Sequence, residues 1–315
     1  MLAVPVRLGR GARQAIISSG RVVVEVVMSV SGQVTTPSGQ VTTPDGRELH
    51  YCTWGPLDAP PVFVLHGTPG SRYLRHAEGE YDRQRVRAIT YDRPGYGFST
   101  RLPSRTVAQA AADVRVIADH LGVDSFAVVG ISGGGPNALA VAAALPDRVT
   151  RCATIVGIGP SDADDLDMFE GMSAENVADW KVAMQGESAL RGDYYVGCVQ
   201  WANSLAESEL PEPIRSMLVE ALTEGLRTPD GIVDDYAAQL APWGFDLSRV
   251  RCPVRVMVAE HDTSVPPTHG QWLARHITNA ELLTVSGDHF GPRQTEEEAL
   301  LGWLAGHDNG ARPVN

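Results

Sequence analysis

The chain has 315 residues, 43% of them apolar, which is enough for one large domain or for one domain with an insertion. Its 26 basic and 38 acidic residues give a formal net charge of −12. No basic stripe alternates with aromatic residues, so we do not expect nucleic acid to be a partner. The four cysteines form no C-x-x-C pair, which favours reduced cysteines and a cytoplasmic protein.

The first 44 residues differ from the rest of the chain. The polar heptad S-G-Q-V-T-T-P occurs twice in tandem, at Ser31–Pro37 and Ser38–Pro44, and it cannot bury enough apolar surface to fold by itself. The apolar run Val22–Met28 is interrupted by Glu25 and is much shorter than the ~20 residues that span a bilayer. We therefore expect residues 1–44 to be a flexible extension, with no signal peptide and no membrane partner.

From residue 45 onward the apolar residues follow regular patterns. Short alternating or continuous apolar runs indicate strands, and apolar residues spaced three to four apart indicate a helix. The helical spacing is seen at Val107, Ala110, Ala111, Val114, Ile117, Ala118 and Leu121. The expected strands are Glu48–Trp54, Pro60–Gly67, Arg85–Asp92, Phe126–Ile131 and Ala153–Ile158.

The strand patterns stop between residues 160 and 251, where the sequence is helical in pattern. Strands return at Val254–Ala259 and Glu281–Val285, each followed by a helical stretch. Strands that alternate with helices predict an α/β fold with a mainly parallel central sheet and helices on both faces. We expect residues 45–159 and 252–315 to form this core and residues 160–251 to be an inserted helical cap.

A serine surrounded by glycines follows one of the predicted strands. The segment from Gly130 to Gly134 fits G-x-S-x-G between a strand and an alanine-rich helix, which is the context that this motif requires. The glycines allow a sharp turn that keeps the Ser132 hydroxyl uncrowded, and the helix that follows directs backbone N–H groups at a developing oxyanion. Ser132 is therefore a candidate nucleophile rather than a helix cap.

A serine nucleophile needs a base, and the base needs a carboxylate that orients it. Asp262 and His289 each stand just beyond a predicted strand, and ligands gather at the carboxyl ends of parallel strands. Asp288 and Glu260 are rival carboxylates. Asp288 directly precedes His289, and neighbouring side chains rarely face one another, so Asp262 is favoured.

Other polar and aromatic residues are weaker candidates. His66 is interpreted as a structural residue of a loop, and His261 as a bystander. The acidic run Ser161–Asp167 lacks the glycine and the distal glutamate of a calcium loop. The cap tryptophans Trp180, Trp201 and Trp243 are expected to be mostly core, although one of them could line a pocket.

Five motifs in order resemble the α/β-hydrolases, and the resemblance runs from about residue 44 to the C-terminus, cap included. These motifs are H-G-T-P-G at His66–Gly70, D-R-P-G-Y-G at Asp92–Gly97, G-I-S-G-G at Gly130–Gly134, D-T-S-V-P at Asp262–Pro266 and G-D-H-F at Gly287–Phe290. The resemblance implies that Ser132 is the nucleophile, His289 the general base and then acid, and Asp262 the orienting acid. It also implies an oxyanion hole made by the backbone N–H groups of Thr68 and Gly133.

The resemblance implies acyl transfer to water, with an ester, lactone, thioester or amide as the small-molecule substrate. Epoxide hydrolases and haloalkane dehalogenases of this fold use an aspartate where this chain has Ser132. Proline-iminopeptidase-like enzymes usually have glycine where this chain has Thr68 and tryptophan where it has Gly133, which makes an aminopeptidase less favoured than an esterase. A carbon–carbon bond hydrolase, a haloperoxidase-like enzyme and a ligand receptor that keeps the triad remain alternatives. No motif for a metal or a dinucleotide is present, so no cofactor is expected.

Overall fold

The computed structural model describes residues 16–18, 21–23, 38–76, 79–212, 214–291 and 294–307. The chain divides into two compact units, Met1–Thr35 and Thr36–Asn315. In the first unit, strands β1 (Ile16–Ser18) and β2 (Arg21–Val23) pair in antiparallel fashion. The other residues of the expected flexible extension, up to residue 37, lie outside the described residues, and so does the first copy of the heptad.

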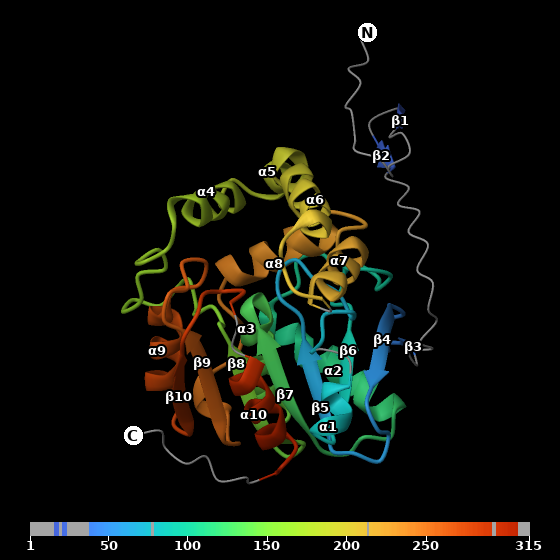
Figure 1. Ribbon diagram of the computed structural model, residues 1–315, viewed down its shortest axis with the longest axis vertical. Coiled ribbons are helices and arrows are strands. Elements are labelled where there is room, and N and C mark those ends of the chain that lie inside the picture. Colours follow the sequence, from blue (N-terminus) through green and yellow to red (C-terminus); the bar gives the residue numbers. More distant parts are fainter. Residues whose placement is uncertain are drawn as a thin grey trace. The chain divides into compact units, whose positions relative to one another are not determined.

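The described part of the second unit contains an eight-stranded sheet in the order β10-β9-β8-β7-β5-β6-β4-β3 (Figure 1). All neighbouring pairs from β10 to β6 are parallel, whereas β4 pairs antiparallel with both β6 and β3. The expected α/β fold with a mainly parallel sheet is therefore confirmed. The strands are β3 (Ser38–Thr42), β4 (Glu48–Trp54), β5 (Pro61–Leu65), β6 (Arg87–Tyr91), β7 (Phe126–Ile131), β8 (Val149–Ile155), β9 (Val254–Ala259) and β10 (Ala280–Val285).

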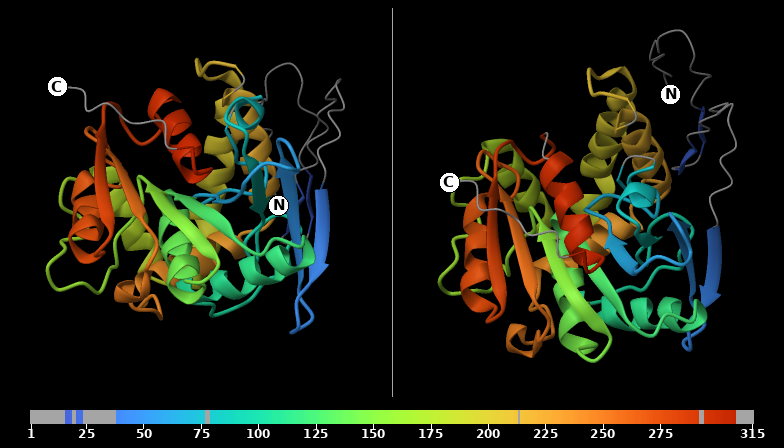
Figure 2. Two further views of the ribbon diagram at one scale, coloured as in Figure 1. Left: turned by 90° about the horizontal axis from the view of Figure 1, so that it is seen from below. Right: turned by 60° about the horizontal axis from the view of Figure 1, so that its bottom comes forward.

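The two faces of the sheet are covered by different helices. In β5, Phe63 and Leu65 belong to one apolar cluster and Val62 and Val64 to another, as the period of two in a strand requires. Helices α2 (Ala110–His120), α3 (Gly135–Ala144) and α9 (Pro267–His276) pack on the first face. Helices α1 (Glu80–Arg83) and α10 (Gln294–Leu304) pack on the second. Figure 2 shows α10, in red, and the blue-green α2 on opposite sides of the sheet.

The sheet begins earlier than the sequence predicts. The second copy of the heptad forms β3, which pairs with β4 from Ser38 opposite Cys52 to Thr42 opposite Glu48. A tight turn joins the two strands, in which the Thr43 N–H donates to the Arg47 carbonyl at 2.8 Å. Apolar Val41 packs against the core of the first face. Residues 38–42 are thus part of the sheet, although they lie before the expected boundary at residue 44.

The other expected strands are present, with small shifts at their ends. Strands β4, β7 and β9 have the bounds that their apolar patterns predict. Strand β8 begins at Val149 rather than Ala153, and it ends at Ile155 because the backbone turns at Val156, whose φ is 45°. The polar residues Thr150 and Arg151 at the start of β8 hide this strand from an apolar pattern.

The segment between β8 and β9 is helical, and we call residues 160–251 the cap segment. Figure 1 shows its helices gathered at one end of the sheet. Leaving out Pro213, this segment contains no strand. None of the helices in the described residues is long and apolar enough to cross a bilayer. The helices of the cap segment are α4 (Ala174–Ala183), α5 (Glu187–Ala189), η3 (Leu190–Tyr194), α6 (Tyr195–Ser204), η4 (Leu205–Glu207), α7 (Ile214–Gly225), α8 (Asp230–Leu240) and η5 (Leu247–Arg249).

Candidate active site

Four of the predicted site residues follow four parallel strands of the sheet. Thr68 comes after β5, Ser132 directly after β7, Asp262 after β9 and His289 after β10. The carboxyl ends of parallel strands meet at one edge of a sheet, so residues up to 221 positions apart in the chain can meet there. The structure brings all four to this edge.

Ser132 stands at a sharp turn between β7 and helix α3. Its φ is 52°, which is a left-handed conformation that a non-glycine residue rarely adopts. The neighbouring glycines allow the backbones to approach closely. A Cβ at Gly130 would lie 2.1 Å from the Gly134 carbonyl oxygen, and a Cβ at Gly134 would lie 2.3 Å from the Leu65 carbonyl oxygen. The strained turn holds the hydroxyl of Ser132 at the tip.

The His289 ring lies between Ser132 and Asp262. Its Nδ1 is 2.8 Å from Asp262 Oδ2, and its Nε2 is 3.1 Å from Ser132 Oγ. A carboxylate beside Nδ1 fixes the proton on that nitrogen, so Nε2 presents a lone pair to the serine hydroxyl. This geometry lets the ring take up a proton from Ser132 while Asp262 stabilises the resulting positive charge.

Asp262 is itself held firmly. Its carboxylate is buried, and its Oδ1 accepts hydrogen bonds from the N–H groups of Ser264 and Val265, both at 2.8 Å. Its Oδ2 therefore faces His289 in a fixed orientation.

The rival residues are placed differently. Asp288 Oδ1 accepts from the N–H of Phe290 at 2.9 Å, so the carboxylate closes a local turn. Glu260 and His261 are exposed.

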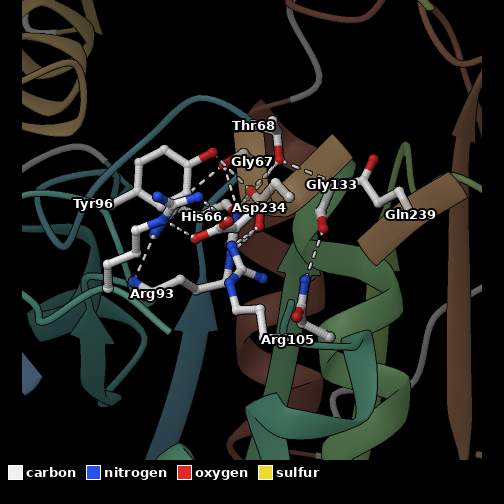
Figure 3. A network of polar contacts seen from close by, with 12 residues as sticks. His66, Gly67, Thr68, Arg93, Tyr96, Arg105, Gly133, Asp234 and Gln239 are labelled. Carbon is white, nitrogen blue, oxygen red and sulfur yellow. Dashed lines mark hydrogen bonds and ion pairs between the residues drawn. The ribbon is translucent and has the colours of Figure 1, made fainter. Parts of the chain in front are cut away.

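The loop after β5 lies against the serine turn. A Cβ at Gly67 would lie 3.4 Å from Ser132 Cβ, and a Cβ at Gly133 would lie 2.4 Å from Thr68 Oγ1. The Gly133 carbonyl accepts a hydrogen bond from the Asn137 side chain at 2.9 Å. Thr68 and Gly133 are therefore neighbours, and Figure 3 shows the two residues close together.

A cavity of about 610 Å³ opens over Ser132 and His289. Eleven of its twenty lining residues come from helices α4, α6 and α8 and from η3 of the cap segment. Its aromatic residues are Trp180, Tyr194, Trp201, Tyr236 and Phe290, and its carboxylates are Glu175, Asp179 and Asp193. Such a space fits a small molecule that is mostly enclosed.

The Cys198 thiol and the Tyr194 phenol in the cavity are uncharged at neutral pH. Burial raises the pKa of the Cys198 thiol to about 11, and it also raises the pKa of Tyr194, whose hydroxyl lies 2.6 Å from that of Tyr236. Burial, together with nearby Glu175, raises the pKa of Asp179. Of the three tryptophans considered in the sequence, Trp180 and Trp201 line the cavity, and Trp243 packs in the core beside Phe245.

His66 has both ring nitrogens engaged in the backbone. Its Nδ1–H donates to the Gly67 carbonyl at 2.7 Å, and its Nε2 accepts from the Arg93 N–H at 3.3 Å. Burial lowers the pKa of His66 well below its usual range, and the Arg93 guanidinium adds to this effect. These contacts give His66 a structural position beside the loop.

A buried charge network beside this loop has no signal in the sequence. Arg93 and Arg105 both form ion pairs with Asp235 of helix α8. Burial alone would raise the pKa of Asp235, but the two guanidinium groups outweigh it and hold this pKa well below its usual range. Arg93 belongs to the quoted D-R-P-G-Y-G motif, whereas no pattern marks Asp235 as its partner 142 positions away.

Within the part of the chain that the structure describes, no three His, Cys, Asp or Glu side chains are grouped as a metal site. In the acidic run of the cap segment, Asp165 accepts a hydrogen bond from the Trp272 indole at 2.5 Å, and Asp167 accepts from the Phe169 N–H at 2.9 Å. These two carboxylates therefore serve local structure.

Comparison with known proteins agrees with this architecture. The chain is 27% identical over 265 residues to the bifunctional esterase/perhydrolase DCH of Acinetobacter calcoaceticus, covering 80% of this chain and 93% of that protein. It is 24% identical over 256 residues to 3-oxoadipate enol-lactonase 2 of Acinetobacter baylyi, covering 77% and 86%. Its fold matches that of a thermophilic esterase from Thermogutta terrifontis with a TM-score of 0.61 and 23% identity, covering 86% and 98%.

The profile of the family described as alpha/beta hydrolase fold matches residues 60–292, which is most of the chain and spans β5 through β10 with the cap segment. The chain therefore belongs to the alpha/beta hydrolase fold family and is a hydrolase of that fold.

Proposed function

We propose that this protein is a serine hydrolase that cleaves a carboxylic ester through an acyl-enzyme intermediate. The observation that carries the proposal is the continuous hydrogen-bonded line from Asp262 through His289 to Ser132, which ends under the 610 Å³ cavity. The relatives named as an esterase and an enol-lactonase support the same bond class, because both names describe cleavage of an ester linkage.

In the first half-reaction, Ser132 Oγ forms a bond to the carbonyl carbon of the ester as its proton passes to His289 Nε2. The carbonyl oxygen becomes an oxyanion, which the N–H groups of Thr68 and Gly133 stabilise. The bond to the alcohol then breaks, and His289 Nε2–H donates its proton to the leaving oxygen. Asp262 remains ionised and stabilises the imidazolium throughout.

In the second half-reaction, water takes the place of the alcohol. His289 accepts a proton from the water as its oxygen forms a bond to the acyl carbon. When the second tetrahedral species breaks down, the acid leaves and the proton returns from His289 to Ser132 Oγ. The enzyme is regenerated, so turnover is multiple. Lactones, thioesters and amides would follow the same steps with a different leaving group.

The test compares Ser132→Ala with Ser125→Ala, a matched control at the opposite, exposed end of β7. On a panel of p-nitrophenyl esters, Ser132→Ala should lose about 10⁴-fold or more in kcat, because the members of a triad act as a unit. A fluorophosphonate should label the wild type and Ser125→Ala but not Ser132→Ala. Activity of Ser132→Ala near that of the wild type would refute the assignment.

The number of substrate molecules cleaved per protein chain distinguishes a hydrolase from a ligand receptor that keeps the triad. A hydrolase releases many equivalents of p-nitrophenol for each protein chain, whereas a receptor stops after one equivalent. A single equivalent released with the whole ester panel would favour the receptor.

A further inference from the structure

Asp235 connects the cap segment to the loop that carries Thr68. It lies on helix α8, its side chain is 1% exposed, and its two oxygens accept from four side chains of the core. The donors are Thr68 Oγ1 at 2.5 Å, Tyr96 OH at 2.8 Å, Arg93 Nη2 at 2.5 Å and Arg105 Nη2. Figure 3 shows the labelled members, Thr68, Tyr96, Arg93 and Arg105, converging beside Gly133.

Arg93 transmits this contact to the backbone of the loop. Its Nη2 donates to the Gly67 carbonyl at 2.9 Å, and its Nη1 donates to the His66 carbonyl. The Gly67 carbonyl also accepts from His66 Nδ1–H at 2.7 Å. The peptide plane between Gly67 and Thr68 is therefore held at its oxygen by two donors.

Holding that oxygen also fixes the direction of the Thr68 N–H. In a planar trans peptide the carbonyl and the N–H of the same unit point in opposite directions. If the Gly67 carbonyl points at Arg93 and His66, then the Thr68 N–H points to the other side of the loop. Because the loop lies against Ser132 and Gly133, small rotations of this peptide decide whether the N–H meets an oxyanion there.

Helix α8 makes two direct contacts with the Thr68 side chain as well. Thr68 Oγ1 donates to Asp235 and accepts from Gln239 Nε2 at 3.3 Å. The hydroxyl is thus held between two residues of the cap segment that stand one helical turn apart. Loss of these contacts would free the loop from α8 without touching Ser132, His289 or Asp262.

We propose that Asp235 is a positioning residue that aligns the oxyanion donor Thr68 N–H, through the Thr68 hydroxyl and through Arg93, so that the oxyanion hole is complete only when helix α8 is seated on the loop. The inference rests on the proposed function, because it concerns the same reaction. It makes the cap segment part of the catalytic geometry and not solely a wall of the cavity.

The experiment compares Asp235→Asn with Asp234→Asn in the full chain. Asp234 is the neighbouring buried carboxylate, and it pairs with Arg101 at 2.8 Å rather than with the loop. With a p-nitrophenyl ester, Asp235→Asn should lose about 10²-fold in kcat with little change in KM, because the lost contact acts on the transition state. Asp234→Asn should retain kcat within about threefold.

Because Asp235→Asn leaves two buried guanidinium groups poorly paired, it could fail to fold, and Thr68→Val supplies a second test. Valine keeps the shape of threonine and replaces only the hydroxyl with a methyl group. We expect kcat to fall about tenfold or more in a chain that still folds, with a melting temperature lowered only by the loss of the hydrogen bonds to Asp235 and Gln239. Thr68→Ser restores the hydroxyl and should recover most of that loss.

A trifluoromethyl ketone reports on the oxyanion directly, because its adduct with a serine carries the negative oxygen. Its affinity should fall in Thr68→Val by the same factor as kcat/KM. The proposal is overturned if Thr68→Val keeps kcat and ketone affinity within threefold of the wild type, or if its losses follow melting temperature alone. Failure of the proposed function looks different, because then Ser132→Ala has the activity of the wild type.

Discussion

The Asp262 carboxylate lies 2.8 Å from Nδ1 of His289, whereas the carboxylate of Asp288, the residue next to this histidine in the chain, accepts from the Phe290 backbone. The side chains of adjacent residues in a chain seldom point toward each other. A residue 27 positions away, in the loop that follows the neighbouring strand β9, can approach the ring edge directly.

This relationship predicts opposite outcomes for two single substitutions. Asp262→Asn should lower kcat for a p-nitrophenyl ester by about 10⁴-fold, since the imidazole loses its orienting acceptor and the stabiliser of its charge. Asp288→Asn should lower it less than about tenfold. If steady-state kinetics gave the reverse order, the acid would be Asp288.

Close packing of Gly133 against the Thr68 loop predicts a steric effect on catalysis. The added Cβ in Gly133→Ala would lie 2.4 Å from Thr68 Oγ1 and 2.8 Å from Gln239 Nε2, so the loop must shift. We expect kcat to fall about 10²-fold or more as the oxyanion donors separate. Gly302→Ala on α10 is the control, because its Cβ meets only the end of the Gln84 side chain at 3.2 Å. Equal kcat in both variants would show that the hole tolerates this displacement.

The carboxylates of the cavity predict a preference for positively charged substrates. Glu175, Asp179 and Asp193 line it, and no arginine or lysine is among the described lining residues. Acetylthiocholine should therefore exceed its uncharged dimethylbutyl isostere about tenfold in kcat/KM at low salt. Asp179→Asn should lower the ratio of kcat/KM for acetylthiocholine to that for the isostere. Glu212→Gln on the exposed surface should leave this ratio unchanged. A ratio near one for the wild type would contradict the prediction.

Two buried histidines predict how stability changes with pH. Burial lowers the pKa of His66 and of His269, so both bind a proton more weakly in the folded chain and take up protons on unfolding below pH ~6.5. Their contribution to stability is complete above that pH and is lost as the pH falls, with an upper limit of about 1.4 kcal/mol per pH unit for each histidine. Asp92 has the opposite effect on the pH dependence of stability. Burial raises its pKa to about 6, so its contribution to stability is lost as the pH rises.

A single substitution can isolate the contribution of His269 to the pH dependence of stability. In His269→Gln, the amide can accept from the Gly159 N–H and donate to the Met168 carbonyl as the ring does, at 3.1 Å each. Urea unfolding between pH 7.5 and 5.5 should show a weaker pH dependence for this variant than for the wild type. The exposed His261→Gln should match the wild type, and an unchanged dependence in His269→Gln would contradict the expectation.

Removing residues from the N-terminus should show where the folded sheet begins. Removal of residues 1–35 should leave the melting temperature within about 2 °C, because the second unit begins at Thr36. Removal of residues 1–44 also deletes β3 and the packing of Val41, so the melting temperature should fall by about 5 °C or more. Equal melting temperatures would show that β3 adds nothing to the stability of the sheet.

Local sequence patterns predicted most of the sheet, because its strands are short apolar runs between turns. The residues that meet at the strand ends were also found, since Ser132, Asp262 and His289 each stand just after such a run. Patterns of this kind locate a residue relative to its near neighbours in the chain. The parallel pairing of the strands then brings the residues at the strand ends together in space.

The buried network around Asp235 could not be found in that way. Its members come from two loops and a cap helix, and an aspartate in a helix rich in acidic residues looks like part of a solvated face. Likewise, the two identical heptads give no sign of which one pairs with β4. The short turn from Thr43 to Arg47 decides this, because it places the second copy beside β4.

Because the two heptads have the same sequence, the gene can gain or lose one copy without changing the residues that precede Asp45. Deletion of Ser31–Pro37 and deletion of Ser38–Pro44 yield the same polypeptide, in which one heptad still precedes Asp45 directly. A replication slip that contracts this repeat therefore leaves the sequence of β3 and its turn intact, and one that expands it adds seven residues upstream of them. The gene can change length at this point without altering the edge of the sheet.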